Sequence, residues 1–150
     1  MAFKQKDDLD AAKASFNRAI AIDPGLVEAH YTLGITYWQA GELSQAESAM
    51  RAVIARDPTY AEAFAMLGTF LKQQDKNDEA ITVLKEAIRL DPTTPGPYTV
   101  LAQALRVKGD TEASKQAAIE GARVKAKREA EQKITFDRSV SEVVGARRRQ

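Results

Sequence analysis

Residues 57–92 decide the fold: they read DPTYAEAFAMLGTFLKQQDKNDEAITVLKEAIRLDP, which begins and ends on an Asp-Pro pair. The same pair stands earlier in the chain, so that Asp23-Pro24, Asp57-Pro58 and Asp91-Pro92 recur at an interval of 34 residues. The hydrophobic residues between the pairs keep one register. A fixed period of this size indicates stacked helical hairpins rather than one closed globular core.

The first helix of each repeat carries one apolar stripe. A bulky residue is followed three positions later by Leu, four positions later by a small residue and seven positions later by another apolar one. The members are His30, Leu33, Gly34 and Tyr37, then Phe64, Leu67, Gly68 and Leu71, then Tyr98, Leu101, Ala102 and Leu105. This spacing places the four residues of each set on one face of an α-helix.

A second helix follows a turn expected at Gly41, Asp75 and Gly109. It shows a small residue, a larger one and a further apolar one, at Ala12, Phe16 and Ala19, at Ala46, Met50 and Val53, at Ala80, Leu84 and Ala87, and weakly at Ser114, Ala118 and Gly121. The prolines end these helices, because proline lacks the amide hydrogen that a helix interior needs. We expect Gly34 and Gly68, with Ala46 and Ala80, to let the two helix backbones approach closely.

These residues resemble the tetratricopeptide repeat family, whose pattern is aromatic-x2-Leu-Gly-x2-Tyr followed by Ala, Phe, Ala and Pro. The pattern appears as His30 to Pro58 and as Phe64 to Pro92, then loses its last positions after Leu105, and the resemblance covers roughly residues 7–121. It implies an all-α, right-handed superhelical solenoid with a long C-terminal capping helix. We expect a partial repeat with only its second helix over 1–25, repeats over 26–59 and 60–93, a degenerate repeat over 94–121 and a helical, basic extension over 122–150.

Both ends depart from the repeat pattern. The helix that would pair with Ala12 to Ala19 is expected to begin before Met1, which leaves an apolar edge near Phe3, Leu9 and Phe16. At the other end the last helix is expected to continue through 123–133, because Ala, Glu, Lys and Arg favour helix. A further short amphipathic helix is indicated by Ile134, Phe136, Val140, Val143 and Val144, before Gly145 and the run Arg147-Arg148-Arg149.

Composition excludes several classes of function. Cysteine is absent, so that disulfides, zinc–thiolate sites and thiol catalysis are excluded. The single histidine, His30, occupies the bulky packing position of its repeat, and no glycine-rich phosphate loop opens a helix. We therefore expect no enzyme, no cofactor and no metal site. Met1 to Asp8 lacks the apolar core of a secretory signal and no apolar run is long enough to span a membrane, so we expect a cytoplasmic protein.

The family resemblance implies a concave groove lined by outward positions of the first helices. Mapped onto this chain, the groove residues are Glu28, Tyr31, Ile35, Trp38, Gln39, Glu62, Thr69, Lys72, Gln73, Thr99, Gln103 and Arg106. These positions differ between repeats while the packing positions recur, which is typical of a specific surface on a general scaffold. The sets do not match the lysine and asparagine clamp of chaperone-binding members, since Tyr31, Ile35, Thr69 and Gln103 occupy clamp positions.

Two features of this surface indicate how it would bind. Tyr31, Ile35 and Trp38 form a second apolar stripe, which either anchors a ligand or covers a neighbouring helix. Lys72 and Arg106 occupy equivalent positions in adjacent repeats and are therefore expected to be neighbours. Such a pair of cations would hold a carboxylate of a ligand, or would simply be solvated surface charge.

The sequence thus predicts a non-catalytic protein–protein interaction scaffold that binds a peptide or partner helix in the concave groove. The alternative is a self-associating structural module, a homo-oligomer that uses the N-terminal edge or the C-terminal helix. Residues 115–150 carry a net charge of +5 and the rest of the chain −4. Glu129, Glu131, Asp137 and Glu142 interrupt this basic tail and argue against nucleic acid as the partner.

Overall fold

The structure is a computed structural model that describes residues 2–147, and in this part of the chain it holds seven helices and no strand. The helices are α1 (Ala2–Ile22), α2 (Val27–Gln39), α3 (Leu43–Arg56), α4 (Ala61–Gln73), α5 (Asn77–Leu90), α6 (Pro95–Val107) and α7 (Thr111–Arg147). Arg148 and Arg149 lie outside the described residues. The side chains of residues 2–7, 137 and 139–147 also lie outside the described part. They include Phe3 of the predicted N-terminal apolar edge and Val140, Val143 and Val144 of the predicted short helix.

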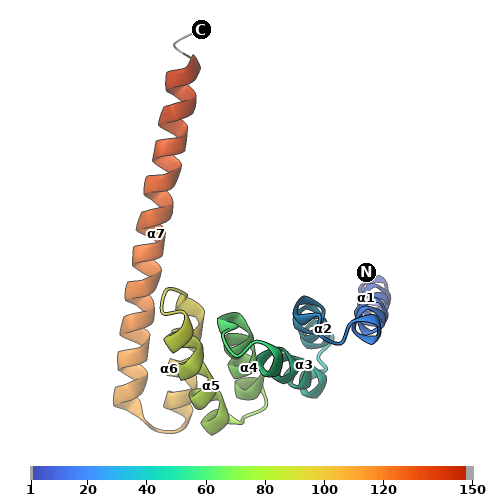
Figure 1. The fold of residues 1–150 in the computed structure, drawn as a ribbon. Helices are drawn as coiled ribbons and strands as arrows, with labels where there is room; N and C mark the ends of the chain where they lie inside the picture. The colour runs from blue at the N-terminus through green and yellow to red at the C-terminus, as the bar shows by residue number, and fades with distance from the viewer. Residues whose placement is uncertain (1, 148–150) are drawn as a thin grey trace.

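The helices form three antiparallel hairpins, α2–α3, α4–α5 and α6–α7, which stack side by side in chain order (Figure 1). Helix α4 packs against α3, and α6 packs against both α4 and α5, so that each hairpin rests on the one before it. Helix α1 packs on α2. The turns inside the hairpins fall at Gly41, Asp75 and Gly109, and all three residues have positive φ angles.

The glycines of the first helices make room for a large side chain of the second helix. A methyl group added at Gly34 would meet Met50 and Ala49, and one added at Gly68 would overlap Leu84. Met50 and Leu84 are both completely buried. The backbone of α3 also approaches closely, since a methyl group at Gly34 would lie 3.5 Å from the carbonyl oxygen of Ala46. The third hairpin has Ala102 and Ala118 at these positions instead.

The interhelical Asp-Pro turns are closed by the aspartate side chain. The Asp57 carboxylate accepts hydrogen bonds from the amide of Thr59 at 2.9 Å and from its hydroxyl at 2.6 Å. Asp91 repeats this arrangement with Thr93 and also accepts from the hydroxyl of Thr94 at 2.7 Å. These bonds from Thr93 and Thr94, with a smaller contribution from the charge of Arg128, lower the pKa of Asp91. The carboxylate thus supplies the turn with acceptors that hold the next helix at a fixed angle.

Helix α7 is a single helix from Thr111 to Arg147, so the prediction of a separate short helix after residue 133 is wrong. Gly145 does not end it, and no proline follows Pro97. Only its first part packs on α6, where Ala117 is buried and Gly121 lies against Tyr98. The hydroxyl of Ser114 donates to the carbonyl of Ala102 at 2.7 Å. The described side chains from Lys125 onward are exposed, and Figure 1 shows this part of α7 extending past the repeats.

The predicted N-terminal apolar edge is partly covered. Leu9 and Phe16 on α1 are half-buried, whereas Ile22 at its end is exposed. Lys13 joins α1 to the next hairpin, since its Nζ atom lies 2.6 Å from Asp10 and 2.7 Å from Glu42. Hydrogen bonds to Asp10 and then to Glu42 raise the pKa of Lys13.

Replacing Gly68 by alanine is expected to lower the free energy of unfolding by about 1–3 kcal/mol, because the added methyl overlaps the buried Leu84. In the double variant Gly68→Ala/Leu84→Ala the loss should be smaller than the sum of the two single losses, since it reproduces the Ala–Ala pair of the third hairpin. Urea unfolding followed by circular dichroism measures both. Gly96→Ala is the matched control, because a methyl there meets nothing within 4 Å. Additive losses in the double variant would contradict this packing.

Candidate functional site

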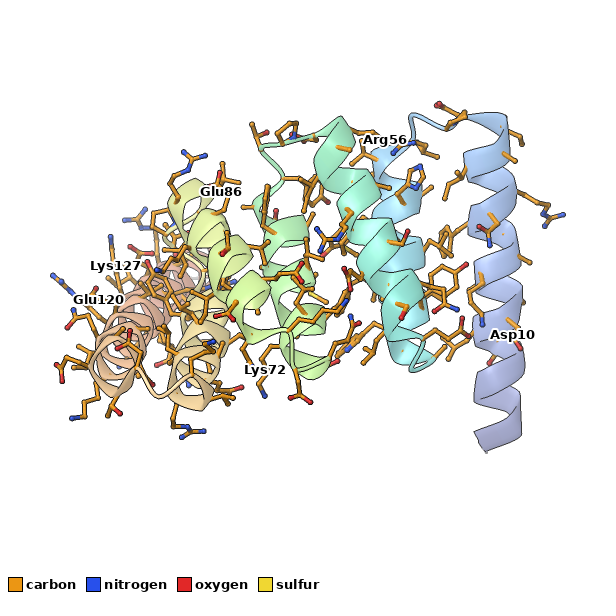
Figure 2. The ribbon with its side chains drawn as sticks, turned by 90° about the horizontal axis from the view of Figure 1, so that it is seen from below. Asp10, Arg56, Lys72, Glu86, Glu120 and Lys127 are labelled. Carbon is orange, nitrogen blue, oxygen red and sulfur yellow. The ribbon has the colours of Figure 1, made fainter. Side chains whose placement is uncertain are left out.

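The first helices present a surface whose two edges carry opposite charge. Glu28 and Glu62 lie in the first turns of α2 and α4, whereas Lys72 and Arg106 lie in the last turns of α4 and α6. Figure 2 shows Lys72 on the opposite edge of the array from Arg56 and Glu86, which lie near the ends of the second helices α3 and α5. Acidic first turns and basic last turns also complement the helix dipole, so these charges stabilise their own helices whether or not a ligand is bound.

The apolar stripe of α2 covers the neighbouring repeat. The Trp38 ring stacks on the fully buried Phe70 of α4 with centroids 6.0 Å apart, and its Nε1 donates to Gln73 Oε1 at 2.9 Å. The Tyr31 ring lies 5.3 Å from that of Tyr60. Tyr31, Ile35 and Trp38 are all half-buried against the core. These contacts favour packing over ligand anchoring for the stripe.

Carboxylates gather at the acidic edge around the two tyrosines. The hydroxyl of Tyr60 donates to Glu28 Oε1 at 3.5 Å. Burial raises the pKa of Tyr31, and the negative charges of Glu62 and Glu28 raise it further. The same causes raise the pKa of Tyr60, with burial again the largest. Both hydroxyls therefore remain protonated and can donate hydrogen bonds at neutral pH.

Among the described residues neither Lys72 nor Arg106 forms an ion pair with a carboxylate. Lys72 is half-buried and Arg106 is exposed. Other basic side chains of the second helices do have partners, such as Arg51 with Glu47 and Glu79. The two cations thus keep their hydrogen-bond donors open to a ligand.

Three predicted site residues come together in a groove of about 410 Å3 between α6 and α7. Thr99, Gln103 and Arg106 line it from α6, together with Pro95 and Ala102. The residues from α7 are Ser114, Ala118, Gly121, Ala122 and Lys125. We call this groove the α6–α7 trough. Sequence reasoning missed its α7 side, although the small residues at Ala118 and Gly121 were the signal.

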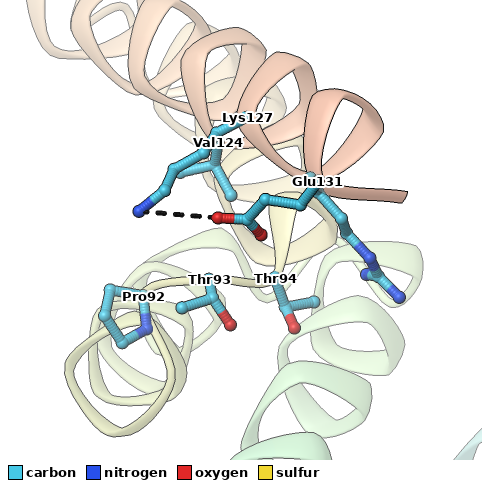
Figure 3. Close-up of a pocket in the computed structure, with 7 residues that line it drawn as sticks. Pro92, Thr93, Thr94, Val124, Lys127 and Glu131 are labelled. Carbon is cyan, nitrogen blue, oxygen red and sulfur yellow. Dashed lines mark ion pairs between the residues drawn. The ribbon is translucent and has the colours of Figure 1, made fainter. Parts of the chain in front are cut away.

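The remaining predicted residues stand apart from the trough. Gln39 is exposed at the end of α2, and the Thr69 hydroxyl donates to the carbonyl of Ala65 within its own helix at 2.9 Å. A second groove, of about 570 Å3, lies where α7 passes the α5–α6 loop (Figure 3). Its lining includes Thr93, Thr94 and the pair Lys127–Glu131, whose charged atoms are 4.0 Å apart. Arg128 also lines this groove, so its lining keeps one positive charge beyond the Lys127–Glu131 pair.

The described residues contain no group of three or more side chains that would hold a metal ion. His30 is buried, and its Nε2 donates to the carbonyl of Pro24 at 3.0 Å, so that it fastens the α1–α2 loop. Arg56 donates to the same carbonyl at 2.7 Å. None of the helices in the described part of the chain is long and apolar enough to cross a membrane.

Comparisons with known proteins agree with this architecture. A tetratricopeptide repeat family model matches residues 4–69, and a second model, described as TPR repeat, matches residues 68–109. No curated protein matches the sequence. The chain belongs to the tetratricopeptide repeat family, and the predicted fold class is confirmed.

Solved structures of MamA proteins share the fold. A crystal structure of MamA is 27% identical with a TM-score of 0.78, and the match covers 82% of this chain and 72% of that one. MamA 41-end from Desulfovibrio magneticus RS-1 is 20% identical with a TM-score of 0.74, over 84% of this chain and 71% of that one. At this identity the second likeness shows the fold alone. The family and the fold together define a protein-interaction scaffold in the general sense.

Trp38→Ala is expected to lower the free energy of unfolding by about 2 kcal/mol, because it removes the Phe70 stack and part of the buried area between the first two full repeats. Chemical denaturation followed by circular dichroism measures the loss. Tryptophan fluorescence cannot be used for the variant, because Trp38 is the only tryptophan. The exposed neighbour Gln39→Ala serves as control and should change stability by less than about 0.5 kcal/mol. Equal stability of Trp38→Ala and the wild type would contradict a packing role for the ring.

Proposed function

We propose that this chain is a non-catalytic scaffold that binds a peptide or partner helix on the surface of its first helices α2, α4 and α6. The observation that carries the proposal is the pair Lys72 and Arg106, which stand at equivalent positions of packed helices without a carboxylate partner in the described chain. Neighbouring helix axes lie about 8–10 Å apart, so two such cations can hold neighbouring carboxylates of one ligand.

The surroundings of the two cations support binding of an acidic segment. Thr99 and Gln103 lie beside Arg106 in the trough and add polar groups without negative charge. The acidic edge at Glu28 and Glu62 would repel the same ligand, and this fixes its direction along the surface. Because the helices are already packed on one another, few scaffold side chains lose freedom on binding.

The variant Lys72→Glu/Arg106→Glu is expected to lose the ligands that the wild type captures from a cell extract. Its affinity for a purified ligand should fall by at least about tenfold, because both contacts become repulsive. Isothermal titration calorimetry measures the purified ligand. The matched control is Lys85→Glu/Arg123→Glu, which makes the same charge change at exposed positions of the second helices α5 and α7. Capture and affinity that are the same in both variants would refute binding at the first-helix surface.

A second candidate function is self-association through the projecting part of α7. Ile134 is 61% exposed and Phe136 is 66% exposed there, so this part of α7 carries two large apolar side chains on its surface. If copies associate through these residues, the mass measured by light scattering should rise with concentration, and Ile134→Ser/Phe136→Ser should abolish the rise. The control Thr135→Ala lies on the same turn. A monomeric mass at all concentrations would remove this candidate.

A further inference from the structure

The surface formed by α6 and α7 corresponds to one that a helix covers in each preceding repeat. Helix α4 lies against α3 and stacks its Phe70 on Trp38 of α2, and α6 lies against α4 and α5. In the described chain no helix follows α7, and at the corresponding place the α6–α7 trough is open. The stack itself therefore indicates that the occupant of this surface is a helix.

The side chains that line the trough on α7 are smaller than those at the equivalent positions of α3. Where α3 has Met50, Val53 and Ile54, α7 has Ala118, Gly121 and Ala122 at positions 68 residues later. Met50 and Val53 are completely buried, whereas Ala118 and Ala122 are exposed. At Gly121 the space is taken by Tyr98 of α6, so the room lies at Ala118 and Ala122. A helix seated in the trough must present bulky apolar side chains to fill it.

The charges of the trough are also changed. Arg106 stands where the first full repeat has Trp38, and Lys125 stands where the preceding repeats have Asp57 and Asp91. The described lining contains no carboxylate, and Lys125 pairs with Glu129, one turn further along α7, at 3.9 Å. Gly121, one turn before Lys125 on α7, lies near Pro95 at the beginning of α6. Arg106 stands next to the last residue of α6, so Lys125 and Arg106 mark opposite ends of the trough. At 1.5 Å per residue, residues 95 to 106 span about 16 Å, or three helical turns.

We propose that the α6–α7 trough binds an amphipathic helix of a partner protein, about three turns long, with an acidic first turn and a bulky apolar face. The helix runs parallel to α6, as the next first helix of the stack would. Its acidic first turn meets Lys125, as Glu28 and Glu62 occupy the first turns of α2 and α4. Its carbonyl end meets Arg106, where a cation complements the helix dipole. This inference rests on the proposed scaffold function and names its partner class.

The test is a displayed library of 14-residue amphipathic helices, panned against the full chain, with affinities of the selected peptides measured by fluorescence anisotropy. The selected peptides should carry Asp or Glu in the first turn and bulky apolar residues at i, i+3, i+4 and i+7. Ala122→Trp, which fills the trough, and Lys125→Glu should each lower the affinity for the selected peptides by at least about tenfold. Lys85→Glu on α5 is exposed and lies outside both the trough and the first-helix surface, so it should leave their affinity within about twofold.

Each other outcome overturns the proposal and separates it from the scaffold function. Peptides that resist Ala122→Trp but are lost with Lys72→Glu would leave the scaffold function standing and place the site on the first-helix surface instead. Selection of no peptide above background would mean that the trough takes no free helix. A mass that doubles in light scattering for the wild type but not for Ala122→Trp would identify a second copy as the occupant. Equal circular dichroism melting curves for Ala122→Trp and wild type verify the fold.

Discussion

The packing of each first helix on the hairpin before it is the interaction on which the rest of this structure depends. A single hairpin cannot enclose its apolar face, so stability comes from contacts between neighbours. The Trp38–Phe70 stack and the burial of Leu84 beneath Gly68 are two parts of this contact, one between repeats and one within a repeat. At the last hairpin the same interaction has no partner in the described chain, and the trough between α6 and α7 is its consequence.

Local patterns predicted the fold well because a repeat imposes the same requirement many times. The Asp-Pro turns, the positive-φ residues Gly41, Asp75 and Gly109, and the large residues opposite glycine each depend on neighbours within one 34-residue unit. The end of α7 was predicted less well. A change of apolar pattern after residue 133 suggested a break, but a chain without proline or a capping sequence continues as helix.

The candidate site was predicted only in part, because a period places residues in equivalent positions but does not show what lies between repeats. Trp38 and Tyr31 occupy outward positions by sequence, yet the rings of Phe70 and Tyr60 lie against them. The α7 side of the trough could not be found from first-helix positions alone. Ala118, Gly121 and Ala122 look like a decayed repeat in sequence, whereas in three dimensions they form one wall of a groove. The twelve predicted groove residues, taken together as a binding surface, stay a prediction.

The central claim is that neighbour packing sets stability along the stack and leaves its last face open. Hydrogen exchange of the backbone amides of the free chain, read by mass spectrometry, tests it most directly. The account predicts the slowest exchange in α4 and α5, which have neighbours on both sides, intermediate exchange in α6 and the first part of α7, and the fastest exchange in α7 beyond residue 125. Protection in α6 and α7 equal to that in α4 and α5 would contradict an open last face.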